Sequence, residues 1–237
     1  MSLFYAENIS PETVLDKSEA RHLAAFRIKE GDQIQIFDGK GTSALAIVKE
    51  ITKTIAKLEI LNTKKFTPRQ NGKITLIVSI AKGQRFDWLI SKAAELGADC
   101  IMPALFERTV KTASGKNLLE RYRKLSISAC KQSGNLFLPR IYPPDRFEEH
   151  LKQLSDSVFL SASLSDNARS LVEIDLDISA NYAVFIGPEG GFTTREEQIL
   201  KDSGAENISL TSTTLRTETA AVCCCSYLAL MRDSARA

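Results

Sequence analysis

The chain has few of the residues that build metal centres or disulfide frameworks. It contains two histidines and five cysteines in 237 residues. The cysteines, at positions 100, 130 and 223 to 225, show no C-x-x-C spacing, which argues against the common zinc sites, and their odd number argues against a disulfide framework. We therefore assign no metal, and we interpret the triplet Cys223 to Cys225 as small apolar filler of a helix in a reducing compartment.

The chain also lacks an apolar run of membrane-spanning length, and its first residues do not form a signal peptide. Hydrophobic residues make up 43% and charged residues 25%, as in ordinary globular proteins. The length allows one small and one medium domain, each with its own core. These features predict a cytoplasmic protein without a membrane partner.

The net charge of +2 is small but unevenly distributed. Residues 73–150 carry a net +5, whereas residues 151–237 carry −5. The stretch from Arg108 to Arg140 is the most basic and contains a single acid, Glu120. A basic region followed by an acidic region suits a protein that binds a polyanion on one side. A solvated helix face can also account for part of the basic pattern.

The chain divides into two predicted domains, residues 1–70 and residues 73–237. Three β-type runs in the first domain cover residues 33–37, 43–48 and 54–60. Asp38-Gly39 between the first two carries the signal of a tight hairpin, so we expect a small β-barrel. The polar segment 63–72 contains proline and glycine without periodicity and is expected to be the linker.

The second domain alternates between strand and helix patterns. Residues 74–80 form a continuous apolar run, which is typical of a strand buried on both faces of a parallel sheet. Helical patterns follow at 88–96 and 118–130, and strand patterns at 158–160 and 183–186. This alternation predicts an α/β fold.

The most informative segment is the glycine-rich loop that follows the strand ending at Ile186. It reads Gly187-Pro188-Glu189-Gly190-Gly191-Phe192, and its glycines let backbone N–H groups approach a ligand closely. Either Thr193 with Glu196 or Thr194 with Glu197 can form a capping box that starts the next helix. Glu189 would repel a phosphate, so a ligand that is neutral or cationic near the loop fits better than a polyphosphate. A purely structural turn is the alternative.

A second strand, loop and helix follow about twenty-five residues later in the sequence. Residues 208–210 read as a short strand, 211–214 as a polar loop, and a helix follows from Thr217. We expect Thr217 to cap that helix at its N-terminus, and Glu218 suits the positive helix end.

The two loop motifs, G-P-E-G-G-F and the later L-R-T-E-T-A, resemble those of the bacterial 16S ribosomal RNA uracil-N3 methyltransferase family (ribosomal small subunit methyltransferase E) of the SPOUT superfamily. The resemblance covers most of the chain, and the pieces occur in the family's order. They also include His22-Leu23 with Arg27, Phe37-Asp38-Gly39, residues 82–87, residues 92–97, Gln132-Ser133 and Pro139.

This resemblance implies a fold and a cofactor. It implies a PUA-like barrel that helps to hold RNA, followed by a SPOUT methyltransferase domain with a C-terminal trefoil knot. The threaded loops would hold S-adenosylmethionine in a bent conformation, and the protein would be a homodimer that acts on the small ribosomal subunit. The implied cofactor-binding residues are Leu160, Ile186, Gly187, Glu189, Gly190, Gly191, Leu210, Thr211, Thr214, Leu215 and Thr217.

The implied reaction needs a group that accepts the proton of uracil N3. Glu218 and Glu189 are the carboxylates in the motifs, and the sequence does not choose between them. Arg216 is the candidate for stabilising negative charge on the uracil oxygens. Helix-terminal electrostatics for Glu218, and a salt bridge or phosphate contact for Arg216, are equally good interpretations.

The target uracil has to be unpaired or flipped out, because N3 lies on its Watson–Crick edge. Candidate RNA-binding residues are Arg21, His22, Arg27, Lys82, Arg85, Arg108, Arg123 and Gln132. His22 alone can equally be a satisfied residue of the barrel. Lys92 and Glu95 are three residues apart on an expected helix and can simply pair with each other.

Several positions depart from the family pattern. Thr211, Thr213 and Thr214 replace the residues expected in the second loop, and Lys131 and Asn135 flank Gln132 where Glu and Arg are expected. These changes leave two alternatives open: a non-catalytic RNA-binding or ribosome-assembly factor that keeps the fold, or a SPOUT methyltransferase with another RNA target.

Overall fold

A computed structural model of the chain describes residues 3–81, 83–110, 117–165 and 167–234. The chain forms two compact units. Unit 1 comprises Met1–Pro68 and Ile127–Leu138, and unit 2 comprises Arg69–Ser126 and Pro139–Ala237. Unit 1 thus takes in a short segment from the middle of the chain as well as the N-terminal residues.

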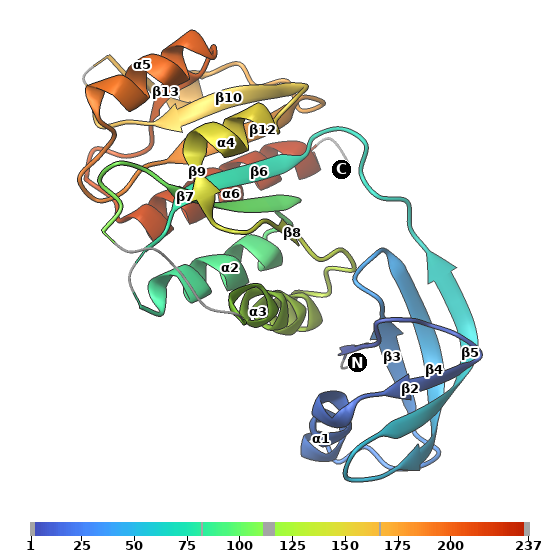
Figure 1. Cartoon of the computed structure of the whole chain (residues 1–237). Coiled ribbons are helices and arrows are strands. Elements are labelled where there is room, and N and C mark those ends of the chain that lie inside the picture. The colour runs from blue at the N-terminus through green and yellow to red at the C-terminus, as the bar shows by residue number, and fades with distance from the viewer. Residues whose placement is uncertain (1–2, 82, 111–116, 166, 235–237) are drawn as a thin grey trace. The chain divides into compact units, whose positions relative to one another are not determined.

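Unit 1 contains a five-stranded sheet in the order β1-β3-β4-β5-β2 and one helix of its own (Figure 1). The elements are β1 (Leu3–Tyr5), β2 (Glu12–Leu15), α1 (Lys17–Ala25), β3 (Gln33–Phe37), β4 (Thr42–Ile51) and β5 (Ala56–Lys65). The expected hairpin is confirmed, because β3 and β4 pair antiparallel around the Asp-Gly turn. Alternate residues of β3 and β4, such as Ile34, Ile36 and Ala46, are buried in one core with Phe4 and Leu23.

The central segment of unit 1 packs on that hairpin. The amide of Gly41 donates to the carbonyl of Leu136, and the amide of Leu138 donates to that of Gly39. Gly41 has a φ of 98°, and a Cβ there would overlap the ring of Phe137, so glycine suits this turn in both conformation and space.

Unit 2 contains an eight-stranded sheet whose pairs are parallel (Figure 1). The order is β11-β13-β10-β12-β6-β7-β8, and β9 pairs with β7. The strands are β6 (Ile74–Ser79), β7 (Cys100–Leu105), β8 (Arg140–Ile141), β9 (Asp145–Arg146), β10 (Ser157–Ala162), β11 (Arg169–Ser170), β12 (Asn181–Ile186) and β13 (Glu206–Ser209). The helices are α2 (Arg85–Glu95), α3 (Leu118–Ser133), α4 (Phe147–Lys152), α5 (Thr194–Asp202) and α6 (Thr217–Ser234), with a short 3-10 helix η1 (Leu171–Glu173).

Helices cover both faces of this sheet. On β6, Leu76 and Val78 pack in a cluster with residues of α2 and α6, whereas Ile77 packs on the other face with Phe147 of α4 and Leu200 of α5. All six residues of β6 are buried, as the continuous apolar run predicted. The fold is therefore mixed α/β, with a three-layer unit 2.

The sequence placed some boundaries wrongly. Strand β5 continues through Lys65, so the expected linker is extended and paired over its first residues. Strand β13 ends at Ser209, which leaves Leu210 in the loop. Thr217 is the first residue of α6, and its hydroxyl donates to the carbonyl of Gly187 at 3.1 Å, so the expected N-cap role of Thr217 is wrong.

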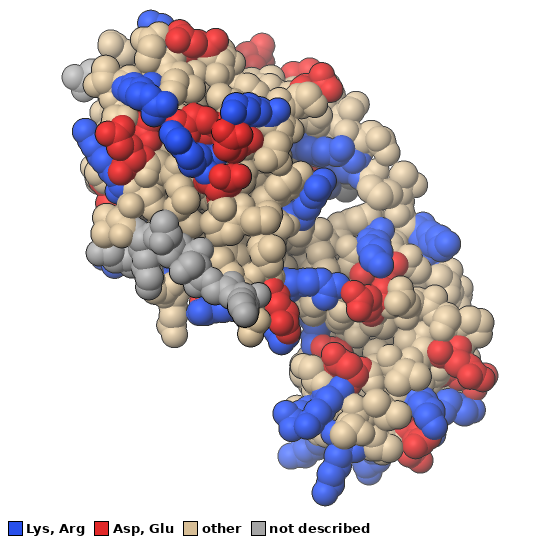
Figure 2. Space-filling model, in the orientation of Figure 1, with Lys and Arg blue, Asp and Glu red and all other residues tan. Residues whose placement is uncertain are grey.

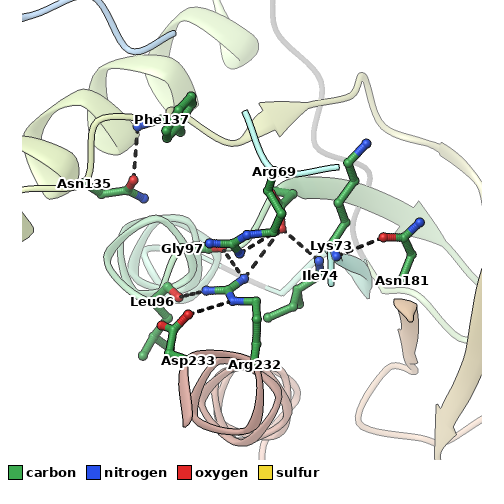
Figure 3. A network of polar contacts seen from close by, with 11 residues as sticks. Arg69, Lys73, Ile74, Leu96, Gly97, Asn135, Phe137, Asn181, Arg232 and Asp233 are labelled. Carbon is green, nitrogen blue, oxygen red and sulfur yellow. Dashed lines mark hydrogen bonds and ion pairs between the residues drawn. The ribbon is translucent and has the colours of Figure 1, made fainter. Parts of the chain in front are cut away.

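The C-terminal helix is fixed to α2 by Arg232 (Figure 3). The guanidinium of Arg232 is largely buried and donates to the carbonyl oxygens of Gly97 and Leu96 at the end of α2, at 3.0 and 3.4 Å. Asp99, which also accepts the amide of Ile74 at 2.9 Å, lies 3.6 Å from the same guanidinium. Cationic donors suit a helix C-terminus, so this contact stabilises the packing of α6 against α2.

The cysteine triplet lies in α6, as expected. Cys224 and Cys225 are buried in the core beside Ala221 and Leu228, and all three thiols are free. Burial raises the pKa of the Cys225 thiol to about 12, which keeps it protonated and unreactive at neutral pH.

Candidate functional site

The candidate site lies at the carboxyl ends of the parallel strands of unit 2. Strands β6 and β12 are neighbours at the centre of the sheet. The chain runs from β6 to β7 on one side, and the later strands β10, β12 and β13 lie on the other side. In open α/β sheets, ligands bind outside the carboxyl ends of strands where the strand order reverses in this way. Both motif loops begin at this edge, since residues 187–192 follow β12 and residues 210–216 follow β13.

The first loop, residues 187–192, is held by side chains from elsewhere in the unit. Arg108, which follows β7, donates from Nη1 to the carbonyl oxygens of Gly190 at 2.6 Å and Phe192 at 3.2 Å. Gly191 has a φ of 70°, a conformation that favours glycine. Because the backbone carbonyls are taken from one side, this loop has a fixed shape before any ligand arrives.

The capping box that ends the first loop is built from Thr193 and Glu196, the first of the two expected pairs. Glu196 accepts the amide of Thr193 at 2.8 Å, and its other oxygen accepts the amide of Glu107 at 2.7 Å. One buried carboxylate therefore caps α5 and also ties the loop after β7 to the loop after β12. The Thr-x-x-Glu pattern predicts the cap, but no local pattern predicts the second bond, because Glu107 lies 89 residues away in the sequence.

The second loop, residues 210–216, is closed by a hydrogen bond between two of its own residues. The hydroxyl of Thr211 donates to the carbonyl of Thr213 at 2.8 Å, and Thr211, Thr214 and Arg216 are exposed. The leucines that flank this loop, Leu210 and Leu215, pack against the core cluster.

The expected cofactor residues come together in part. Leu160 and Ile186 belong to the large core cluster of unit 2, and Leu210 and Leu215 pack against the same cluster. The bond from Thr217 to Gly187 joins the start of α6 to the first loop. Gly190 and Gly191 lie at the solvent side of that loop with Glu189.

Arg85 at the start of α2 lies between the two acidic candidates. Its Nη1 is 3.8 Å from Glu189 Oε1, and its Nε is 3.8 Å from Glu218 Oε1. Glu218 Oε2 is buried and has no hydrogen-bond partner among the described residues. A buried carboxylate oxygen without a donor is costly, so it marks a point at which a ligand group can bond.

The other expected RNA-binding residues are spread over both units. Arg21 and Arg27 of unit 1 are exposed, as are Arg123 of unit 2 and Gln132 of unit 1. His22 is half-buried between the rings of Phe4 and Phe26, and burial lowers the pKa of its imidazole. Lys82 lies outside the described residues. Lys92 and Glu95 pair with each other at 2.8 Å, as the simpler interpretation expected.

The unusual residues around Gln132 have structural partners within unit 1. Lys131 forms a 2.6 Å ion pair with Glu19 of α1, and both side chains are largely buried. Asn135 accepts the amide of Phe137 at 3.0 Å and so shapes the turn after α3. Both departures from the family pattern therefore have a local physical reason.

Charge is interspersed rather than segregated on the face of unit 2 seen in Figure 2, where Lys and Arg lie among Asp and Glu. Within the described part of the chain, we find no cluster of three or more His, Cys, Asp and Glu side chains suited to a metal ion. No helix there combines the length and apolar composition needed to cross a bilayer.

Two family models match the chain. Residues 68–229 match the model described as an RNA methyltransferase domain, and residues 15–61 match that described as an RNA methyltransferase PUA domain. The first match contains both motif loops and Arg85, and the second contains α1 and most of the sheet of unit 1.

Whole proteins match over almost the full length. Ribosomal RNA small subunit methyltransferase E from Aquifex aeolicus is 29% identical over 235 residues, which cover 96% of this chain and 99% of that protein. The crystal structure of ribosomal RNA small subunit methyltransferase E from Neisseria gonorrhoeae, bound to S-adenosyl methionine, is 34% identical and covers 96% of each chain with a TM-score of 0.86. A probable rRNA-methyltransferase from Porphyromonas gingivalis shares the fold with a TM-score of 0.88 over 100% of both chains, at 23% identity.

Proposed function

This chain belongs to the ribosomal RNA small subunit methyltransferase E family, and from that premise we propose that it transfers the methyl group of S-adenosylmethionine to N3 of a uridine in 16S ribosomal RNA. The observation that carries the proposal is the pair of loops at the carboxyl ends of β12 and β13, joined by the hydrogen bond from Thr217 to Gly187. The Neisseria gonorrhoeae relative, which has this fold, is bound to S-adenosyl methionine.

The residues at these loops fit the cofactor. Gly190 and Gly191 present backbone without side chains, and Leu210 and Leu215 of the second loop pack against the core cluster that contains Leu160 and Ile186. Glu189 and Glu218 bring negative charge, and Glu218 Oε2 is a buried acceptor without a partner among the described residues. This set favours a cationic ligand with hydroxyl or amino groups over a polyphosphate.

The bound cofactor supplies a methyl group on a sulfonium, whose carbon is electrophilic and needs no metal. The chain has to orient the uracil, exclude water and accept the N3 proton. We propose Glu218, in preference to Glu189, as the acceptor of this proton. Glu218 is buried and one of its oxygens has no hydrogen-bond partner among the described residues, whereas Glu189 is about half exposed. We propose that Arg216, exposed in the loop just before α6, stabilises the negative charge that develops on a uracil oxygen.

The RNA would be bound by exposed basic and polar residues from both units. We propose Arg21, Arg27, Arg123 and Gln132 for this role, with His22 and Lys82 as further candidates. Since N3 is blocked in a base pair, the target uridine has to be single-stranded or flipped out. We further propose that the protein acts as a homodimer in the cytoplasm, that its C-terminal segment forms a trefoil knot, and that the domains are residues 1–70 and 73–237.

The test is nucleoside mass spectrometry of 16S ribosomal RNA from cells with and without this gene. We expect N3-methyluridine to disappear without the gene and to return when the wild-type gene is supplied. A Glu218→Gln gene should fail to restore it, whereas a Glu197→Gln gene, altered at an exposed position of α5, should restore it. An unchanged N3-methyluridine level would overturn the proposed target.

Isothermal calorimetry with S-adenosylmethionine separates the alternatives. Lack of binding would favour the non-catalytic RNA-binding factor, and binding without loss of N3-methyluridine would favour another RNA target. Primer extension on the same RNA identifies the nucleotide, because a methyl group on N3 blocks base pairing and stops reverse transcription.

A further inference from the structure

The guanidinium of Arg85 connects the acidic groups of the two loops without bonding tightly to either. Both ion-pair distances, to Glu189 Oε1 and to Glu218 Oε1, are 3.8 Å. Neither is short enough for a good hydrogen bond. Among the described residues, charge attraction to these two carboxylates therefore holds the guanidinium of Arg85.

The three side chains differ in their contact with water. The side chain of Glu218 is 9% exposed, whereas those of Glu189 and Arg85 are 49% and 44% exposed. Water and salt screen the exposed pair, but the buried carboxylate feels nearby charge more strongly. Arg85 is thus the solvent-exposed partner of a buried acid.

Resting on the proposed function, we propose that Arg85 sets the preference of the site between S-adenosylmethionine and its product S-adenosylhomocysteine. The methyl donor carries a positive sulfonium that the product lacks. Glu189, Glu218 and Arg85 together carry a single net negative charge, which is opposite to the charge of that cation. Without Arg85 the carboxylates would attract the cationic donor more strongly and leave the neutral thioether product comparatively disfavoured.

This balance has a consequence for the reaction rate. The sulfonium charge disappears as the methyl group is transferred, so an interaction that favours the cation stabilises the ground state more than the transition state. Arg85 reduces that interaction. Its removal should lower KM for the donor and lower kcat as well, a combination that simple loss of a structural contact does not produce.

The inference is tested by calorimetry of the full-length chain with the two ligands separately. We expect Arg85→Gln to raise the ratio of the dissociation constant of S-adenosylhomocysteine to that of S-adenosylmethionine by roughly threefold to tenfold. Arg85→Lys, which keeps the charge, should return the ratio toward the wild-type value. Arg146→Gln serves as the matched control, since Arg146 is also an exposed arginine paired with a glutamate, at 3.2 Å from Glu148.

If Arg85→Gln folds poorly, a second variant tests the same ratio of dissociation constants. Glu189→Gln removes one negative charge at a half-exposed position and should shift the same ratio in the opposite direction. An unchanged ratio in either variant, or an equal weakening of both ligands, would overturn the role of Arg85. Failure of the wild-type chain to bind S-adenosylmethionine would instead overturn the proposed function.

Discussion

The two loops at the carboxyl edge of unit 2 are fixed in opposite ways. The 187–192 loop receives hydrogen bonds from Arg108 and Thr217, and the buried Glu196 anchors the helix that follows it. The 210–216 loop is mostly exposed and is closed by a bond between two of its own residues, Thr211 and Thr213. A loop fixed by its surroundings is preorganised for its ligand, whereas one closed on itself can adjust as a ligand arrives.

This difference bears on the departures from the family pattern in the second loop, whereas Lys131 and Asn135 lie outside both loops. The unusual residues Thr211, Thr213 and Thr214 all lie in the self-closed loop, and none of the first loop's residues is unusual. Arg108 bonds the backbone carbonyl oxygens of Gly190 and Phe192 in the first loop, whereas Thr211, Thr213 and Thr214 in the second loop are exposed. A substitution costs less folding stability at a position where the side chain has few fixed contacts to lose.

The largest effect is expected at Gly190, inside the fixed loop. A Cβ there would lie 3.3 Å from Cδ of Arg108, so the branched side chain of Gly190→Val has to displace Arg108 and occupy the space proposed for the ligand. We expect the affinity for S-adenosylmethionine to fall by about a hundredfold or more, or about 2.7 kcal/mol, with the melting temperature nearly unchanged. The affinity of Gly190→Ala should lie between those of the wild-type chain and Gly190→Val. Full affinity in Gly190→Val would mean that the pocket lies elsewhere.

Loss of the carboxylate of Glu196 should destabilise the whole unit. Glu196→Ala removes the buried carboxylate that accepts two part-buried amides, those of Thr193 and Glu107, which costs about 2 kcal/mol of unfolding free energy. Urea denaturation measures this loss. Glu197→Ala, at the exposed member of the unused capping pair, should change stability by less than about 0.5 kcal/mol, and equal losses in both variants would show that Glu196 does not anchor the loop.

Thr217 links the loops, and its replacement should have a moderate effect. Thr217→Val keeps the shape of the side chain but removes the donor to Gly187, at a cost of about 1 kcal/mol in denaturant unfolding. Thr219→Val, at an exposed position of the same helix turn, provides the control for helix propensity. If the two variants lose the same stability, the bond to Gly187 contributes nothing.

The smallest effect is expected in the self-closed loop. Thr211→Ala removes the exposed bond to the carbonyl of Thr213, and we expect a stability change within about 0.5 kcal/mol. A loss above 1 kcal/mol by denaturant unfolding would mean that this loop is as firmly fixed as the first, and the contrast between the loops would fail.

Much of the fold could be predicted because its signals are local. The continuous apolar run of β6, the Asp-Gly turn between β3 and β4, and the Thr193–Glu196 capping box each depend on neighbouring residues, and all three are present in the structure. Local signals failed at boundaries: Thr217 has the composition of an N-cap, but a tertiary acceptor, the carbonyl of Gly187, takes its hydroxyl.

By itself, the sequence determined the α/β alternation, the two glycine- and threonine-rich loops and the family to which they point, since spacing along the chain is enough to define them. Only the tertiary structure decided which charges meet. Arg85 and Glu218 are 133 positions apart, and Arg108 and Gly190 are 82 apart. The parallel sheet brings their strand ends to one edge, and no local pattern encodes that proximity.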